Sequence, residues 1–447
     1  MPRTIPQSIR GVTLAAAMFA ALPCALHAQL GSFNPPPGPA GVYAIRDVRI
    51  VPVSGPVIER GNVVIGADGL IQAVGADAVI PEGARTLDGS GLSVYPGMMD
   101  AGTSMGLSEI PQGAVATMDA SEVGTFTPNV QAIHGLNPHS AHIAVTRVVG
   151  VTHVVSRPSG GILAGQATLV NMAGDTPPRM ELLPRIGMAA MLPRAGFAGR
   201  DFGGGGGTQA VNQLRQHQLD SLRSMLADAR AYMKAHEAYA ANSSLPRPSH
   251  DVVLESMVPM VTGQMPVLFA ADAASDIRES VEFARANGLK AIIVGGREAP
   301  DVASLLKEND VPVIITGVMS LPQGEDDPYD QNYSLPARLA AAGVRYAIST
   351  GNSGSAVRDL PYHAGMAAAH GLPKEEALKA VTIYPAQIFG VSDRLGTIEP
   401  GKIANLVLTT GDMLEARTDT RALFIGGRPV PLDSKHTYLW EMFRDRP

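Results

Sequence analysis

The sequence has little cysteine, few aromatic residues and no excess of basic charge. Its one cysteine among 447 residues, Cys24, can form neither an intrachain disulfide nor a thiolate metal site, so stability must come from packing. Aromatic residues make up only 5% of the chain, so aliphatic side chains must fill the core. Lysine and arginine total 35 against 41 acidic residues. This balance argues against nucleic-acid or anionic-membrane binding as the main function.

The first 28 residues have the pattern of a secretory signal peptide. Arg3 and Arg10 supply the positive end, residues 11–26 the apolar stretch, and cleavage is expected after Ala28. The apolar run is too short to span a bilayer and is interrupted by Pro23. We therefore expect a periplasmic or secreted protein with no membrane span. Its mature chain would keep 33 basic side chains, because cleavage removes two arginines.

The rest of the chain divides into a linker, two β-rich ends and an alternating centre. Residues 29–41 form a proline-rich linker. Residues 42–98 and 396–447 contain short alternating apolar runs separated by turns, which indicate antiparallel strands. Residues 99–395 alternate β-branched runs with helical stretches, which indicates βαβ units. We predict an α/β fold with a (β/α)8 TIM-like barrel and a small composite β-sandwich formed by both chain ends.

Two helices are predicted with particular features. The helix at 275–287 has Ser275 as its expected cap, Asp276 in its first turn and Gly288 just beyond its end. The helix at 211–240 is rich in Gln, Arg and His, so we expect it to be solvated.

Several segments together resemble a known family. The most specific is 393–407, with the sequence DRLGTIEPGKIANLV, preceded at 380–386 by AVTIYPA. Residues 95–104 (YPGMMDAGTS) and 160–166 (GGILAGQ) complete the pattern. The chain resembles the amidohydrolase superfamily, nearest its imidazolonepropionase-like branch. In catalytic members, the resemblance implies a metal-activated water that attacks an amide or ring C–N bond.

The resemblance also implies where the metal ligands of catalytic members would stand. The histidine pair of the first barrel strand corresponds to Gly102 and Ser104, and two further histidines correspond to Ala270 and Gly295. The aspartate that acts as ligand and general base corresponds to Gly351. A divalent metal needs three or more imidazole or carboxylate ligands, and none of these residues ligates a metal well. We therefore hypothesise a member whose metal site is vestigial, with no cofactor expected.

Other polar residues near the predicted strand ends could line a pocket. Asp272 and Glu298 could perform acid/base chemistry without a metal, although a helix-flanking role also accounts for Glu298. Asn352 follows the last predicted barrel strand. Arg157 and Gln166 lie in or beside the glycine-rich segment, where they could contact an anion or a carbonyl group. A structural turn explains the same glycines equally well.

Histidines cluster in one part of the sequence, at His134, His139, His142 and His153. His139 and His142 could share a helix face, so a relocated metal site is conceivable. A turn at 136–138 and the distance from the predicted strand ends favour an ordinary polar surface.

Three functions remain open. The leading one is a non-catalytic protein that binds a small molecule in the old pocket, or that forms an oligomer, either of its own copies or with a catalytic amidohydrolase. The second is an active amidohydrolase that hydrolyses non-peptide or peptide-like C–N bonds through an unassigned site, with zinc or another divalent metal. The third is a structural scaffold subunit.

Overall fold

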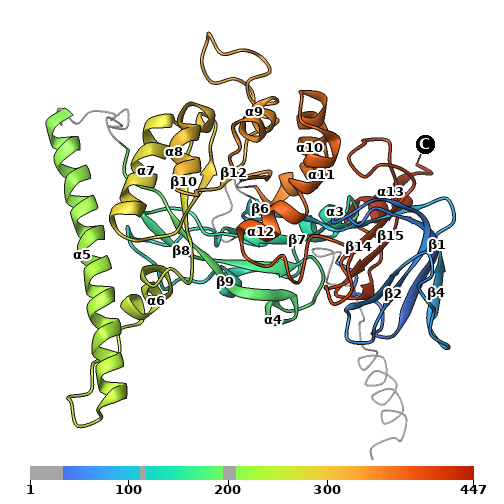
Figure 1. The fold of residues 1–447 in the computed structure, drawn as a ribbon, viewed down its shortest axis with the longest axis horizontal. Helices are drawn as coiled ribbons and strands as arrows, with labels where there is room; N and C mark the ends of the chain where they lie inside the picture. The colour runs from blue at the N-terminus through green and yellow to red at the C-terminus, as the bar shows by residue number, and fades with distance from the viewer. Residues whose placement is uncertain (1–33, 111–116, 195–207, 352, 447) are drawn as a thin grey trace, which may run out of the picture.

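The computed structural model describes residues 34–110, 117–194, 208–351 and 353–446, and its strands form two eight-stranded sheets (Figure 1). One sheet combines strands from both ends of the chain, and the other curls into a nearly closed barrel. The predicted fold class is confirmed. Within the described residues, no helix has the length and apolar character needed to cross a membrane.

The sheet from both chain ends has the order β16-β15-β14-β5-β1-β2-β3, with β4 also paired to β1. β14 runs antiparallel to β5, which joins the two ends of the chain. Alternate residues of these strands pack around one core that includes Ile45, Val63, Leu406 and Phe424. The strands are β1 (Tyr43–Ile50), β2 (Ile58–Ile65), β3 (Ile71–Gly75), β4 (Arg85–Asp88), β5 (Ser93–Pro96), β14 (Leu406–Thr409), β15 (Thr420–Ile425) and β16 (Arg428–Pro429).

The barrel sheet runs in chain order from β6 to β13. Its strands are β6 (Met98–Thr103), β7 (Val151–Ser156), β8 (Leu163–Asn171), β9 (Glu181–Ala190), β10 (Val267–Ala271), β11 (Ala291–Gly295), β12 (Val313–Ile315) and β13 (Tyr346–Ile348). Inward-facing residues such as Leu268, Val294 and Ile314 fill the barrel interior. The opposite faces of the same strands pack against the surrounding helices.

One strand departs from the expected parallel pattern. β8 runs antiparallel to both β7 and β9, whereas the other neighbouring pairs in the barrel sheet are parallel. The connection from β7 to β8 spans only residues 157–162, which is too short for a crossover helix. Gly160 and Gly161 make the reversal possible because both have positive φ, at 88° and 66°.

Helices cover the outside of the barrel, and α5 lies at the end of the molecule farthest from the sheet of the chain ends (Figure 1). The α-helices are α2 (Ala132–Gly135), α3 (Ala141–Arg147), α4 (Pro177–Met180), α5 (Thr208–Ala241), α6 (Val252–Val261), α7 (Ala274–Ala286), α8 (Ala303–Glu308), α9 (Leu335–Ala342), α10 (Leu360–Ala369), α11 (Lys374–Lys379), α12 (Ile383–Ile388) and α13 (Lys435–Phe443). Short 3-10 helices lie at η2 (Ala299–Val302) and η3 (Gly354–Asp359).

Two helix predictions need correction. Ser275 does not cap α7, because the helix begins at Ala274 and its N-cap residue is Ala273. The first turn is instead held by Glu298, whose Oε2 accepts a hydrogen bond from the Ala274 backbone N–H at 2.8 Å. α5 is not solvated all round, because one of its faces buries Leu219, Leu222, Leu226 and Ala229.

Candidate functional site

The positions that the resemblance assigns to metal ligands lie at the carboxyl ends of barrel strands. Gly102 is the penultimate residue of β6, and Ser104 follows that strand directly. Ala270 and Gly295 lie within the last two residues of β10 and β11, and Gly351 follows β13. Carboxyl ends of barrel strands meet at one face, so all five positions belong to the same mouth of the barrel.

Arg157 lies beside Gly102. A Cβ atom built on Gly102 would lie 3.6 Å from Arg157 Nε and 3.7 Å from Ser349 Oγ. Arg157 is buried directly after β7, and its backbone N–H donates to the Thr103 carbonyl at 2.9 Å. Burial lowers the pKa of Arg157 to about 10, while the negative charge of Asp100 acts in the opposite direction. The guanidinium therefore stays charged at neutral pH and places a permanent cation inside the barrel mouth.

Asp100 is the fully buried anion of the same region. Its Oδ1 accepts hydrogen bonds from the Gly102 backbone N–H at 3.1 Å and from Ser349 Oγ at 2.5 Å. Its Oδ2 accepts from the backbone N–H and the hydroxyl of Thr350, at 3.1 Å and 2.6 Å. These bonds tie β6 to the segment after β13 and use the acceptor positions of the carboxylate. Asp100 therefore fastens the first barrel strand to the last.

Backbone geometry disfavours a side chain at two of the positions that the resemblance assigns to metal ligands. Gly295 has φ of +119°, and a Cβ atom there would lie 2.6 Å from Asp272 Oδ1 and 2.8 Å from the Ala271 carbonyl oxygen. Gly351 has φ of +86°, and its Cβ atom would lie 3.2 Å from the Thr316 carbonyl oxygen. Positive φ strains any residue with a Cβ, so local backbone geometry favours glycine at both sites.

A cavity of about 180 Å³ opens beside Gly295, at the carboxyl ends of β10, β11 and β12. Asp272 and Arg297 give it one acidic and one basic wall. Within the described parts of the chain, the Asp272 carboxylate has neither a hydrogen-bond nor an ion-pair partner. We call this space the strand-end cavity; its lining residues are Asp272, Gly295, Arg297, Thr316, Gly317, Ser320, Gln323, Asn332 and Leu335.

The other predicted pocket residues lie around or away from this cavity. Glu298 supports it, since its Oε1 lies 3.5 Å from an Arg297 guanidinium nitrogen while its Oε2 holds the start of α7. Gln166 is buried in β8, where its side-chain amide donates to the Pro128 carbonyl at 2.9 Å. Asn352 lies outside the described residues. The cavity thus brings together Asp272 and Gly295 from the sequence-predicted set.

The histidines lie in separate surroundings. His134 and His139 are exposed, and His142 Nε2 lies 3.2 Å from the Glu109 carbonyl oxygen. His153 is fully enclosed in β7, with Nδ1 2.7 Å from Thr152 Oγ1, and burial lowers the pKa of His153 to about 3. No three His, Cys, Asp or Glu side chains gather into a possible metal site within the described residues.

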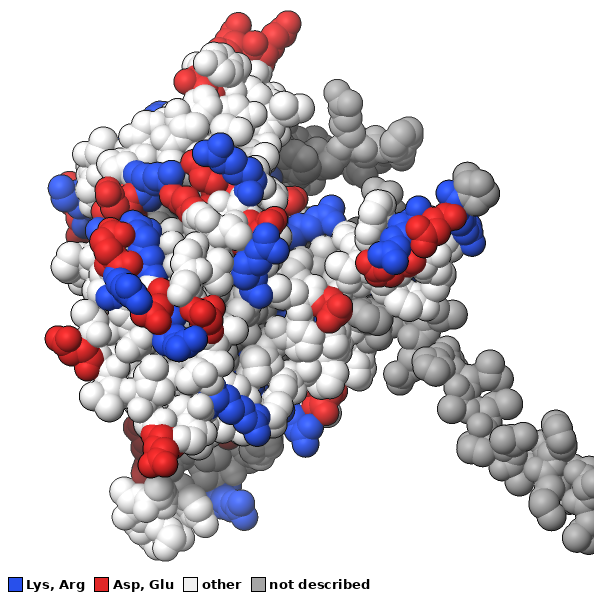
Figure 2. Space-filling model, turned by 90° about the vertical axis from the view of Figure 1, so that its right-hand side faces the viewer, with Lys and Arg blue, Asp and Glu red and all other residues white. Residues whose placement is uncertain are grey.

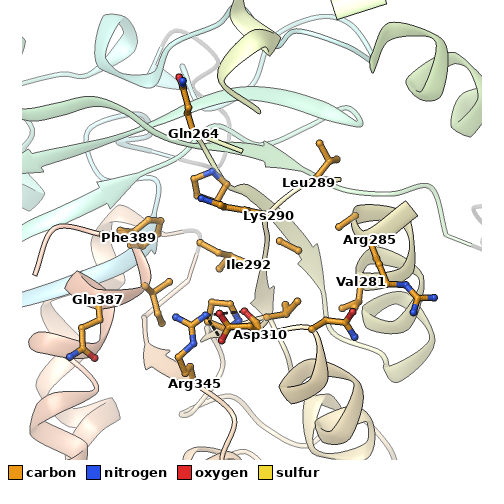
Figure 3. A pocket seen from close by; sticks show the side chains of 18 residues that line it. Gln264, Val281, Arg285, Leu289, Lys290, Ile292, Asp310, Arg345, Gln387 and Phe389 are labelled. Carbon is orange, nitrogen blue, oxygen red and sulfur yellow. Dashed lines mark hydrogen bonds and ion pairs between the residues drawn. The ribbon is translucent and has the colours of Figure 1, made fainter. Parts of the chain in front are cut away.

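A larger cavity, of about 530 Å³, lies at the opposite end of the barrel (Figure 3). Lys290 and Arg345 directly precede β11 and β13, so this space opens at the amino ends of the strands. Figure 3 shows Arg345 beside Asp310, and the two are joined by an ion pair of 2.8 Å. Barrel enzymes place their chemistry at the carboxyl ends of the strands, so the strand-end cavity remains the candidate site.

Charges on the face drawn in Figure 2 are of both signs and interspersed. No continuous basic stripe crosses that face of the described residues. It therefore offers no electrostatic footprint for nucleic acid.

Sequence reasoning missed several residues of the site. Asp100 stood in the quoted motif at 95–104, but its partners Ser349 and Thr350 lie about 250 positions later. Arg297 and Thr316 could have been found by a simple signal, since each follows a predicted strand closely.

Known proteins share both the sequence pattern and the fold. The Amidohydrolase family matches residues 270–430. Imidazolonepropionase from Mesorhizobium japonicum is 24% identical over 415 residues, covering 83% of this chain and 92% of that protein. An imidazolonepropionase from Yersinia pseudotuberculosis is 31% identical over 148 residues, covering 32% of this chain and 34% of that protein.

Among solved structures, an amidohydrolase from Thermotoga maritima has a TM-score of 0.76 and 22% identity, covering 87% of this chain and 99% of that chain. This likeness shows the fold: a barrel accompanied by a sheet from both chain ends. Residues 270–430 therefore match the Amidohydrolase family, and most of the chain is similar in sequence to imidazolonepropionases and in fold to an amidohydrolase.

Proposed function

We propose that this amidohydrolase-like protein does not carry out metal-dependent hydrolysis and instead binds a small molecule in the strand-end cavity. The observation that carries the proposal is the coordinated change at the barrel mouth. Gly295 and Gly351 have backbone angles that disfavour side chains, and Arg157 Nε lies 3.6 Å from the place of a Cβ atom built on Gly102. A histidine restored at Gly295 or Gly351 would therefore strain the backbone.

The donor set does not fit a divalent metal. Zinc binds imidazole, thiolate or carboxylate groups, usually four in tetrahedral geometry or three plus water. The buried carboxylate nearest to the vestigial positions, Asp100, is already saturated by hydrogen bonds. The adjacent guanidinium of Arg157 repels a second cation.

The strand-end cavity supports the binding role. It keeps the location where barrel proteins of this kind bind their ligands, and its walls carry polar groups of both charges. The signal-like residues 1–28 support a periplasmic or secreted location for this binding protein. Localisation is tested by fractionating cells that express the full chain.

Metal analysis of the purified mature protein tests the loss of metal chemistry. After incubation with zinc or manganese and dialysis, mass spectrometry of the bound metal should find far less than one ion per chain. About one tightly held zinc per chain, whose removal abolishes a hydrolase activity, would contradict the proposal. Melting-temperature screening with small molecules tests the binding role, because a ligand of the folded state raises the melting temperature.

A further inference from the structure

Asp272 presents an unpaired carboxylate to the partly open strand-end cavity. It is half-buried, lines the strand-end cavity, and has no hydrogen-bond or ion-pair partner within the described residues. A carboxylate that leaves bulk water normally gains a donor or a cation in compensation. The cavity itself supplies no such partner to Asp272, so the compensating group is expected to come with the ligand.

We propose that the strand-end cavity binds a small organic cation whose ammonium group contacts Asp272. The proposal rests on the proposed binding function and names the class of ligand. Asp272 lies against Gly295, and Gly295 is the residue that the resemblance assigns to a metal-ligand position. The carboxylate of Asp272 attracts positive charge. The ammonium group of the ligand would supply that charge, where a metal ion would supply it in a catalytic relative.

Arg297 extends the description of the ligand. Arg297 lines the same cavity, and a nitrogen of its guanidinium lies 3.5 Å from Glu298 Oε1, while Glu298 Oε2 accepts a hydrogen bond from the α7 backbone. A guanidinium suits a carboxylate. A cavity with Asp272 on one wall and Arg297 on another is therefore complementary to a zwitterion.

Cavity size and rigidity restrict the ligand further. Its volume of about 180 Å³ lies below the range of roughly 300–1,000 Å³ that is usual for drug-sized ligands. The buried amide of Asn332 donates to the Ser320 and Leu321 carbonyls at 3.0 and 3.2 Å, which fixes the loop that forms one wall. The ligand is thus of amino-acid size and enters a preformed site.

An inorganic divalent cation fits this cavity less well. Calcium takes six to eight oxygen ligands, normally with several carboxylates among them. Asp272 is the only acidic residue among those that line the cavity, and no group of three acidic or imidazole side chains forms in the described residues. An ammonium group needs only one carboxylate and a few neutral acceptors.

Four probes that share a three-carbon skeleton test the proposal on the mature full-length protein: β-alanine, propylamine, propionate and propanamide. Saturation-transfer NMR titrations give an affinity for each. We expect β-alanine to bind most tightly and propylamine next, with propionate and propanamide much weaker. Calcium chloride added to the β-alanine complex should not displace the ligand.

Matched variants assign the effect to residues. Asp272→Asn keeps the side-chain shape and should weaken β-alanine and propylamine at least tenfold, whereas Arg297→Gln should weaken β-alanine alone. Asp77→Asn, at an exposed site in the turn after β3, is the control and should bind as the unaltered protein does. Melting curves of each variant verify folding.

Each alternative outcome counts against the inference. Unchanged amine binding by Asp272→Asn, displacement by calcium, or no binding of any probe overturns it. Binding of propionate or propanamide in preference to the amines overturns the cation class but leaves the cavity as a ligand site. The binding function itself fails separately, if no compound in the wider melting-temperature screen stabilises the protein.

Discussion

Replacement of Asp100 by asparagine should destabilise the protein strongly. The change keeps the side-chain size but removes the negative charge. It also replaces one acceptor oxygen by an NH2 group, which would face the donors that now bond to that oxygen. Two hydroxyl and two backbone donors now converge on that carboxylate, and Arg157 lies in the same buried region. Removing one partner of a buried charge pair leaves the other charge uncompensated, which costs about 3–5 kcal/mol.

The expected loss can be expressed as a melting temperature. The entropy of unfolding is roughly 2 cal/mol/K per residue, or about 0.9 kcal/mol/K for a chain of 447 residues. A loss of about 4 kcal/mol therefore lowers the melting temperature by roughly 4 °C. Differential scanning calorimetry of Asp100→Asn and of the control Asp272→Asn, whose carboxylate has no partner in the described residues, gives the comparison.

A double-mutant cycle with Arg157→Met isolates the charge term. We expect the double variant to be less destabilised than the sum of the two single variants, with a coupling of about 1 kcal/mol or more. Additive effects would show that Asp100 and Arg157 do not interact. A melting temperature of Asp100→Asn within about 1 °C of Asp272→Asn would refute the whole account of the buried carboxylate.

Two further perturbations test the barrel mouth and its surroundings. Gly295→Ala should lower the free energy of unfolding, measured by urea denaturation, by about 2–3 kcal/mol, which is more than the loss expected for the control Gly83→Ala. Both glycines have positive φ, but only at Gly295 would the added Cβ lie within 3 Å of Asp272 and of backbone. Equal losses for the two variants would show that the crowding at Gly295 is relieved. Burial lowers the pKa of His153 to about 3, so below its ordinary pKa near 6.5 the unfolded chain binds a proton that the folded protein does not. The stability that neutral His153 contributes is therefore complete above about pH 6.5 and is lost as the pH falls toward 3, by at most about 1.4 kcal/mol per pH unit; His153→Gln should flatten the curve between pH 6 and 4, and an unchanged slope would contradict the burial effect.

Sequence patterns predicted the parts of the fold that depend on local order. Alternating apolar runs indicated the strands of the barrel and of the sheet of the chain ends, because strand periodicity depends on consecutive residues. The resemblance carried by the segment at 393–407 implied the same architecture. The strand ends also located Gly102, Gly295 and Gly351, since each lies in or just after a recognisable apolar run.

Features that depend on contacts between distant residues were beyond the same patterns. Ser275 had the chemistry of a helix cap, but Glu298, 24 positions after Ala274, took that role at the start of α7. Arg157 was recognised as a polar residue near a glycine-rich turn, yet its position beside Gly102 follows from the pairing of β6 with β7. The antiparallel direction of β8 depends on the six-residue connection at 157–162. The sequence alone did not predict that this connection reverses the chain, because the reversal is defined by the pairing of β7 with β8.

The bonds between Asp100 and the Ser349–Thr350 segment also impose an order on biosynthesis. β6 cannot be fastened to the far side of the barrel until about 250 further residues have been made. The pairing of β5 with β14 is delayed still longer, because β14 begins at Leu406. Both early strands therefore spend most of translation with an exposed edge, and such edges invite pairing with other chains. A nascent chain that ends before residue 346 would lack the last strand of both sheets, so the protein reaches its native form only after nearly complete synthesis.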